Sequence, residues 1–428
     1  MARFTVVIVG AGQGGLQVAA SLREGGFDGA IVLVGDEPGL PYQRPPLSKG
    51  YLTGEVGADR LLLRREAFYV DRRIDLLAGE RAVAIDRPGR RVRLASGGAL
   101  AYDHLVLATG ARDRPLPVPG AELDGVLRLR TRAEAELLRQ RLAGGVRDAV
   151  VVGAGFIGLE FASVAAKLGA RVHVIEMTRR PMARAVSPDV SAFFHAAHAG
   201  AGAGILFGAT VARLVGADGR VAGVETGDGL RIPADLVVVG IGVVPNTELA
   251  AGAGLAVDDG IVVDEHLLTA DPAISAVGDC AAYPSRFAAG RVRLESVQNA
   301  VDQARCVAAR LAGRPPAPYA AVPWFWSDQG KLRLQIVGLT AGHDVAVVRG
   351  DVEGGAFSVF CFRGRRLVGI ESVNRPADHM AGRRLLAGGW PDLAPEQLAD
   401  AGFDLQAQAA AVRPAAGGRV DGPPRAAT

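Results

Sequence analysis

The sequence predicts an α/β protein with two Rossmann-type domains followed by a smaller α+β domain. Three observations predict this fold class. A short β-branched run, a glycine-rich turn and a helical pattern follow one another at residues 4–26, and the same series returns at 148–169. Each copy later contains an apolar run that leads to another glycine turn, at 102–115 and at 231–246. After residue 323 the sequence changes to short strand-like runs, which favour an antiparallel sheet. The repeat indicates a duplicated domain.

The bulk composition agrees with a folded protein of several domains. A chain of 428 residues, 49% of them hydrophobic, can bury two or three cores. The formal net charge of +3 is spread along the chain without a basic cluster, so we expect no nucleic-acid partner. Three isolated cysteines indicate neither a disulfide framework nor a metal site. A strand that begins almost at the N-terminus, and the lack of a long apolar run, favour a cytoplasmic protein without membrane attachment.

The first glycine-rich unit has the spacing of a dinucleotide site. The apolar run before Gly10 is typical of a strand that is buried on both faces. Gly10 permits the tight turn, Gly12 lets the backbone approach a pyrophosphate, and Gly15 lets the helix pack closely against the strand. The helix N-terminus offers free N–H groups to the phosphates. Asp36 ends the second strand, where its carboxylate is placed to accept hydrogen bonds from a ribose.

The second unit repeats this scheme with Gly153, Gly155 and Gly158, and Glu176 closes its second strand. One glycine motif alone is a weak signal, but two complete units in one chain make two nucleotide ligands the better explanation. A carboxylate beside the ribose repels a 2′-phosphate, so Glu176 favours NADH. Arg179 and Arg180 follow closely and could accept a phosphate, which leaves NADPH open.

Several segments together resemble the FAD-dependent NADH:ferredoxin reductases, which serve bacterial cytochrome monooxygenases and Rieske-type dioxygenases. These segments read VGDEPGLPYQRPPLSKGYL, LVLATGARDRPLPVPG, VVVGAGFIGLE, ADLVVVGIGVVPNTEL, ISAVGDCA and PWFWSDQ. They occur in the family's order from about residue 4 to about residue 380. The resemblance implies a glutathione-reductase-like fold, tightly bound FAD, NADH as the hydride donor, and a 2Fe-2S ferredoxin as the electron acceptor.

The resemblance also divides the chain. It implies an FAD-binding domain in two parts, 1–113 and 247–323, with an NAD-binding domain inserted at 114–246. Pro-rich stretches lie close to two of these boundaries. A C-terminal domain is expected at 324–406, and the Ala-, Gly- and Pro-rich composition predicts a disordered tail over 407–428.

Most of the expected cofactor contacts follow from matching motifs. Asp279 lies at the start of a predicted helix, where it could accept from the ribityl hydroxyls, serve as a plain N-cap, or do both. The residues expected at FAD are Gly10, Gly12, Gly14, Gly15, Asp36, Lys49, Ala82, Arg130, Asp279 and Val297. Those expected at NADH are Gly153, Gly155, Ile157, Gly158, Glu160 and Glu176.

Two of these residues, Lys49 and Glu160, are expected to be catalytic. Lys49 resembles the family lysine beside the flavin N5 edge, where an ammonium would stabilise the anion of the reduced ring. Glu160 resembles the glutamate that pairs with this lysine and orients the nicotinamide amide. The alternative for each is an ordinary solvated surface residue. Hydride transfer needs no general base, so positioning carries much of the rate.

A helix over 301–314 presents arginines in partial alignment. Arg305 and Arg310 are expected to dock an acidic ferredoxin over the flavin, although such a pattern is usually a solvated helix face. The segment after Asp36 contains no cysteine, unlike that of disulfide reductases and peroxidases of this fold. We therefore expect electrons to leave the flavin singly, without passing through a thiol.

Two rival functions remain at the level of the sequence. An NADH:quinone oxidoreductase also has two dinucleotide sites, but it should carry an amphipathic C-terminal anchor. Residues 383–408 are interrupted by Gly and Pro and lack a basic amphipathic face. A regulatory flavoprotein related to apoptosis-inducing factor should show a basic surface or long insertions, and the sequence shows neither.

Overall fold

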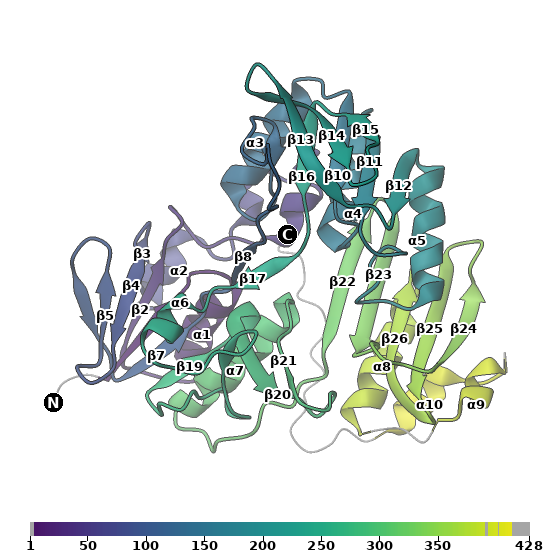
Figure 1. Ribbon diagram of the computed structural model, residues 1–428. Helices are drawn as coiled ribbons and strands as arrows, with labels where there is room; N and C mark the ends of the chain where they lie inside the picture. Colours follow the sequence, from purple (N-terminus) through teal and green to yellow (C-terminus); the bar gives the residue numbers. More distant parts are fainter. Residues whose placement is uncertain (1–3, 390–392, 401, 413–428) are drawn as a thin grey trace.

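The computed structural model describes residues 4–389, 393–400 and 402–412, and Figure 1 shows them as three regions. The first region is built on a five-stranded parallel sheet that uses two distant parts of the chain. Its strand order is β19 (Ile274–Ala276), β7 (His104–Leu107), β1 (Thr5–Val9), β2 (Ala30–Gly35) and β3 (Asp75–Ala78). Helices α1 (Gln13–Glu24) and α7 (Val297–Leu311) pack against each other, and three antiparallel strands complete the region: β4 (Ala82–Asp86), β5 (Arg91–Leu94) and β6 (Ala99–Ala101).

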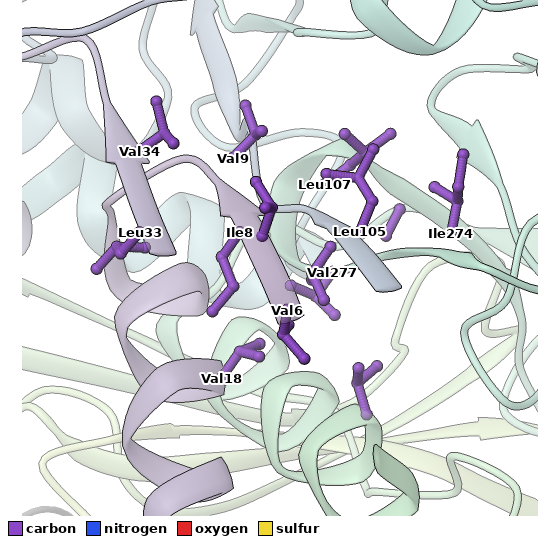
Figure 2. Close-up of a cluster of buried hydrophobic side chains, with 14 of the residues drawn as sticks. Val6, Ile8, Val9, Val18, Leu33, Val34, Leu105, Leu107, Ile274 and Val277 are labelled. Atoms are coloured by element: carbon purple, nitrogen blue, oxygen red, sulfur yellow. The ribbon is translucent and has the colours of Figure 1, made fainter. Parts of the chain in front are cut away.

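The core of this sheet explains why a continuous apolar run becomes its central strand. Val6, Val7 and Ile8 have no exposed surface, because covered faces receive the side chains on both sides of the strand. Figure 2 shows Ile8 among Val18 of α1, Leu33 of β2 and other aliphatic residues from separate elements. The packed sheet therefore holds the end of β1 in place, and the glycine turn begins directly after this end.

The second region repeats the first in its topology. Its parallel sheet has the order β12 (Ala203–Phe207), β11 (Arg171–Glu176), β10 (Asp148–Val152), β16 (Leu236–Val239) and β9 (Val126–Leu127). It also carries an antiparallel meander, β13 (Val211–Ala217), β14 (Arg220–Thr226) and β15 (Arg231–Pro233). Its helices are α3 (Arg132–Ala143), α4 (Phe156–Lys167) and α5 (Pro188–Gly200). The predicted duplication is confirmed, since β10, β11, β12 and β16 take the places of β1, β2, β3 and β7.

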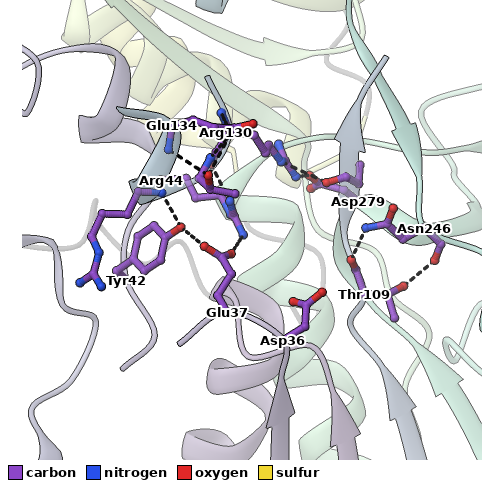
Figure 3. A network of polar contacts seen from close by, with 12 residues as sticks. Asp36, Glu37, Tyr42, Arg44, Thr109, Arg130, Glu134, Asn246 and Asp279 are labelled. Carbon is purple, nitrogen blue, oxygen red and sulfur yellow. Dashed lines mark hydrogen bonds and ion pairs between the residues drawn. The ribbon is translucent and has the colours of Figure 1, made fainter. Parts of the chain in front are cut away.

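A short two-stranded ribbon connects these two regions. Strand β8 (Ala111–Asp113) leads into the second region, β17 (Val243–Pro245) leads out of it, and the two pair in antiparallel fashion. Beside the ribbon, the Thr109 hydroxyl donates to the Asn246 carbonyl at 2.6 Å, and the Asn246 amide donates back to the Thr109 carbonyl at 2.9 Å (Figure 3). The ribbon lies close to residues 113 and 246, and the domain boundaries expected there stay predictions. Small elements complete this part of the chain: η1 (Pro45–Ser48), η2 (Ala58–Leu61), α2 (Glu66–Asp71), α6 (Glu248–Gly252), β18 (Ile261–Val262), η3 (Gly278–Cys280), β20 (Ala281–Pro284) and β21 (Arg291–Val292).

The C-terminal region is an antiparallel sheet with helices on one side, as the strand-like runs predicted. The strand order is β22 (Trp324–Gln329), β23 (Leu332–Gly338), β26 (Arg366–Val373), β25 (Ala356–Arg363) and β24 (Val345–Asp351). Helices α8 (Pro376–Ala387), α9 (Pro395–Ala399) and α10 (Leu405–Ala411) pack at this sheet or against one another. No helix within the described residues is long and apolar enough to cross a membrane.

Two local predictions need correction. Asp279 does not begin a helix: it lies in the 3₁₀ turn η3, and β20 follows at once, so no helix dipole begins there. Residues 407–411 are not a disordered tail, because α10 includes them. Asp404 caps this helix at the Ala407 N–H, and Ala409 is buried. The rest of the predicted tail, 413–428, lies outside the described residues.

Candidate active site

The first glycine turn has the geometry that the sequence predicts. Gly10 follows β1 with φ +111°, and a Cβ there would lie 2.1 Å from the Ala108 carbonyl oxygen. A Cβ at Gly15 would lie 1.9 Å from the Gly10 carbonyl oxygen. The fold itself therefore requires both glycines, because any side chain would collide with backbone.

The second glycine turn repeats this geometry. Gly153 follows β10 with φ +103°, and a Cβ there would lie 2.5 Å from the Gly240 carbonyl oxygen. A Cβ at Gly158 would lie 2.2 Å from the Gly153 carbonyl oxygen. Each turn delivers the chain into a helix, α1 or α4, whose first N–H groups have no side-chain cap.

The middle glycine of each turn is different, because the protein's own packing does not need it. Gly12 has φ −83°, which any residue adopts, and a Cβ there would meet no atom within 4 Å. Gly155 has φ −78°, and a Cβ there would meet only the Gly240 carbonyl oxygen, at 3.9 Å. Open space in front of an uncapped helix N-terminus fits the close approach of a pyrophosphate. The two turns therefore fit two dinucleotides.

Acidic residues stand at the ends of the second strands, as predicted. Asp36 directly follows β2, its side chain is 59% exposed, and Arg81 Nη2 lies 3.5 Å from its Oδ2. Glu176 ends β11, where its Oε2 accepts from the Ala154 N–H at 2.7 Å and its Oε1 accepts from the Thr178 N–H at 2.8 Å. Because the carboxyl ends of parallel strands meet at one edge, each acid lies at the same edge as its glycine turn.

The two arginines after Glu176 have different surroundings. The Arg180 guanidinium donates to the carbonyls of Ala183 and Val186 and to the Ser191 hydroxyl, at 2.6–2.8 Å. These bonds hold Arg180 against the loop that precedes α5. Arg179 is exposed. Arg179 is therefore the better placed of the two for contact with a 2′-phosphate.

An ion pair lies at the carboxyl edge of the first sheet. Arg130 Nη2 donates to Asp279 Oδ2 at 2.9 Å, and Arg130 Nε donates to the Ala111 carbonyl at 3.1 Å (Figure 3). Burial disfavours the charge on Arg130, but the carboxylates of Asp279, Asp113 and Glu295 together favour it more strongly, and the pKa of Arg130 is raised. Asp279 follows β19 and Asp36 follows β2, so both lie at the edge that carries the first glycine turn.

The remaining residues expected at the cofactors lie on separate elements. Ala82 is buried at the start of β4, Val297 is the first residue of α7, and Ile157 in α4 is 43% exposed. A Cβ at Gly14 would lie 3.5 Å from the Val277 side chain, which is an ordinary van der Waals contact, so the packing of α1 against its neighbours does not require a glycine there. Their contacts with FAD and NADH stay predictions.

Lys49 and Glu160, which the sequence places 111 residues apart, form an ion pair. Lys49 Nζ lies 2.7 Å from Glu160 Oε2, and the Glu160 side chain is 2% exposed. The surface alternative for Glu160 is therefore wrong: its carboxylate is buried where the three regions meet. Ser48 of the first region donates to Oε2 at 2.5 Å, and Ser327 of the C-terminal region donates to Oε1 at 2.6 Å.

Sequence reasoning missed both serines. Ser48 directly precedes Lys49, and this adjacency is a signal that could have found it. Ser327 lies in the PWFWSDQ segment, in which the two tryptophans are the more conspicuous residues. Nothing local to Ser327 indicates a partner 167 residues away on α4.

The two arginines expected to dock a partner differ in how far their side chains are exposed to solvent. Arg305 is exposed on α7, and its Nη1 lies 3.4 Å from Asp302 Oδ1. Arg310 is half-buried, and its Nη2 donates to the Ser275 hydroxyl at 2.8 Å. Burial lowers the pKa of Arg310. Arg305 is thus the more accessible of the two for a charged partner.

Comparison with protein families gives two matches. Residues 4–304 match the pyridine nucleotide-disulphide oxidoreductase family, and residues 324–409 match the reductase C-terminal family. The first match covers both glycine turns, and the second covers the sheet that carries Ser327.

Individual relatives are similar over almost the whole chain. Rhodocoxin reductase of Rhodococcus erythropolis is 57% identical over 402 residues, which is 94% of this chain and 93% of the relative. Putidaredoxin reductase of Pseudomonas putida is 44% identical over 413 residues, 95% of this chain and 97% of the relative.

Two solved structures agree in fold. The ferredoxin reductase for the CYP199A2 system of Rhodopseudomonas palustris superposes with a TM-score of 0.92 at 53% identity, over 95% of this chain and 99% of that one. The reductase in the covalent putidaredoxin reductase–putidaredoxin complex gives 0.92 at 42% identity, over 96% and 99%. The glutathione-reductase-like fold is thereby confirmed, and the chain belongs to the pyridine nucleotide-disulphide oxidoreductase family and, within it, to the FAD-dependent ferredoxin reductases.

Proposed function

We propose that this enzyme takes a hydride from NADH onto bound FAD and passes the electrons singly to an acidic 2Fe-2S ferredoxin, which feeds a cytochrome monooxygenase or a Rieske-type dioxygenase. The observation that carries the proposal is the ion pair of Lys49 and Glu160. It joins the region of the first glycine turn to that of the second at a buried point. A flavin and a nicotinamide extending from the two turns would meet beside it.

The side chains at this point have distinct tasks. Bound FAD supplies the chemistry, because it accepts two electrons as a hydride and releases them one at a time. Lys49 places a positive charge where the reduced ring would carry negative charge. Glu160 holds Lys49 and offers a carboxylate oxygen to the nicotinamide amide. Gly12 and Gly155 admit the two pyrophosphates, and Asp36 and Glu176 accept from the two riboses.

The cysteines support one-electron release. Cys280, Cys306 and Cys361 are all unpaired. Burial raises the pKa of each thiol, which disfavours the reactive thiolate. The segment from Asp36 to Lys49 has no cysteine. Free thiols are also typical of the cytoplasm, where we place the enzyme.

The proposal predicts electron transfer that depends on a ferredoxin and on salt. Purified holoenzyme with NADH should reduce cytochrome c only when a 2Fe-2S ferredoxin is added. The rate should fall about five-fold or more between about 0.05 M and about 0.5 M salt, because exposed charges steer the encounter. Arg305→Glu should raise the KM for ferredoxin about five-fold. Arg310→Glu should raise the KM of the folded protein less, because Arg310 points inward.

The control variant is Arg147→Glu, at the amino end of β10, where the Arg147 side chain is 82% exposed. It should leave the KM for ferredoxin unchanged. Ferricyanide turnover, which needs no ferredoxin docking, should be the same in Arg305→Glu and wild type. Efficient turnover with a quinone and none with any ferredoxin would instead favour the quinone reductase.

The proposal also predicts a preference for NADH that depends on Glu176. Its carboxylate is fixed by Ala154 and Thr178, so it should repel a 2′-phosphate. Glu176→Ala should lower the ratio of kcat/KM for NADH over NADPH about ten-fold or more. Adding Arg179→Ala should remove part of the gained NADPH activity. If steady-state kinetics give the same ratio in wild type and Glu176→Ala, another group sets the preference.

A further inference from the structure

A buried chain of hydrogen bonds leads away from Glu160 through the C-terminal region. Ser327 Oγ donates to Glu160 Oε1 at 2.6 Å, and Gln329 Nε2 lies 3.3 Å from Ser327 Oγ. Gln329 Oε1 lies 2.7 Å from His198 Nε2. All four side chains are buried, with residue exposures of 0–4%. Ser327 and Gln329 lie on β22, whereas Glu160 and His198 lie on α4 and α5 of the second region.

Chemistry allows one direction for these bonds. A carboxylate only accepts hydrogen bonds, so the single hydroxyl proton of Ser327 must be donated to Glu160. Gln329 must then present its NH₂ group to the Ser327 oxygen, which turns its carbonyl towards His198. His198 must therefore donate from Nε2. Burial lowers the pKa of His198, which agrees with a neutral ring that carries one proton. Every donor thus points towards Glu160, and bonds aligned in this way reinforce one another.

The two oxygens of Glu160 are not equivalent. Oε2 receives the Lys49 ammonium and the Ser48 hydroxyl. Within the described part of the chain, the Ser327 hydroxyl is the only hydrogen-bond donor to Oε1. Loss of Ser327 would leave a buried acceptor without a partner, whereas loss of Ser48 would leave Oε2 still paired with Lys49.

We propose that Ser327 is a positioning residue for hydride transfer, held in its donating orientation by Gln329 and His198. It fixes the Glu160 carboxylate that faces the nicotinamide. The inference rests on the proposed function and deepens it, because it gives the C-terminal region a direct part in the reductive half-reaction. A displacement of reacting groups by about 1 Å can cost about 100-fold in rate, so a carboxylate held through Oε2 alone would be less well placed for the reaction.

The test compares Ser327→Ala, Ser327→Thr and Gln329→Leu as FAD-loaded proteins. Ser327→Ala should reduce the rate of flavin reduction at saturating NADH about ten-fold or more and weaken NAD⁺ binding by calorimetry. ADP-ribose lacks the nicotinamide, and its dissociation constant should change less than about two-fold. Ser327→Thr keeps the hydroxyl and should recover most of the rate. Gln329→Leu should give a smaller loss than Ser327→Ala.

The matched control is Ser358→Ala in the same sheet. Ser358 is equally buried and donates to the Asp378 carboxylate at 2.9 Å, with no contact to Glu160. It should lower the melting temperature without changing the reduction rate or NAD⁺ affinity. If Ser327→Ala matches Ser358→Ala in every readout, the serine is merely structural and the inference fails. If wild-type holoenzyme itself is not reduced by NADH, the proposed function fails first, and the two failures remain distinct.

Discussion

Gly12→Val is expected to yield a folded protein that carries about a tenth of the wild-type FAD or less. The backbone at Gly12 is extended and a Cβ there meets no protein atom, so the fold tolerates valine. The valine side chain would instead occupy the space in front of α1 that the pyrophosphate needs. The measurement is the flavin absorbance per protein, together with far-UV circular dichroism to show that the chain is folded.

Gly155→Val is the matched control, because it makes the equivalent change in the second turn. This variant should remain yellow and be bleached normally by dithionite, while its reduction by NADH falls about 100-fold or more. The two variants should thus separate the two ligands. Equal loss of FAD from both would contradict the assignment of one cofactor to each turn.

Glu160→Leu is expected to lower the rate of flavin reduction by NADH about 100-fold at saturating NADH. Removal of the carboxylate leaves the Ser327 hydroxyl without an acceptor. Lys49 and Ser48 lose their short contacts to Glu160 and keep only the longer ones to the Pro45 carbonyl, at 3.3 and 3.4 Å. Because these groups are largely buried, the variant should also lose about 1–3 kcal/mol of stability. Stopped-flow absorbance measures the rate, and thermal unfolding measures the stability.

Glu225→Gln supplies the control for a change of charge. Glu225 forms ion pairs with Arg213 and Arg231 on the exposed meander of the second region. It should change neither the reduction rate nor the melting temperature measurably, since exposed pairs contribute little. A Glu160→Leu enzyme that is reduced as fast as wild type would remove Glu160 from the mechanism.

Local patterns sufficed to predict most of the fold. The glycine turns were predictable because the backbone at Gly10 and Gly153 has a positive φ, which favours glycine and therefore shows in the sequence. The duplication was predictable because both copies of the turn carry this glycine pattern. Asp279 was assigned to a helix start from its motif alone, but the chain turns once and continues as β20. The helix over 405–411 was hidden because its apolar side chains are one leucine and otherwise alanines, which give no distinct apolar face, and because its burial comes from packing on α8.

Contacts between regions could not be predicted in this way. Glu371 on β26 has no exposed surface and accepts from the N–H and hydroxyl of Ser187 at the start of α5. Burial raises the pKa of Glu371. This contact fastens the second region to the C-terminal sheet and so helps to hold Glu160 near Ser327. Neither residue carries a local signal, because the contact exists only after distant segments have packed. The Lys49–Glu160 pair was anticipated from family resemblance, whereas its two serines needed the structure.

Anaerobic titration of the FAD-loaded enzyme with NADH tests the central claim most directly. If the two glycine turns hold a flavin and a nicotinamide against a common point at Lys49 and Glu160, about one equivalent of NADH per FAD should bleach the visible flavin absorbance. A preparation that dithionite bleaches but that keeps its yellow colour through excess NADH would contradict the account.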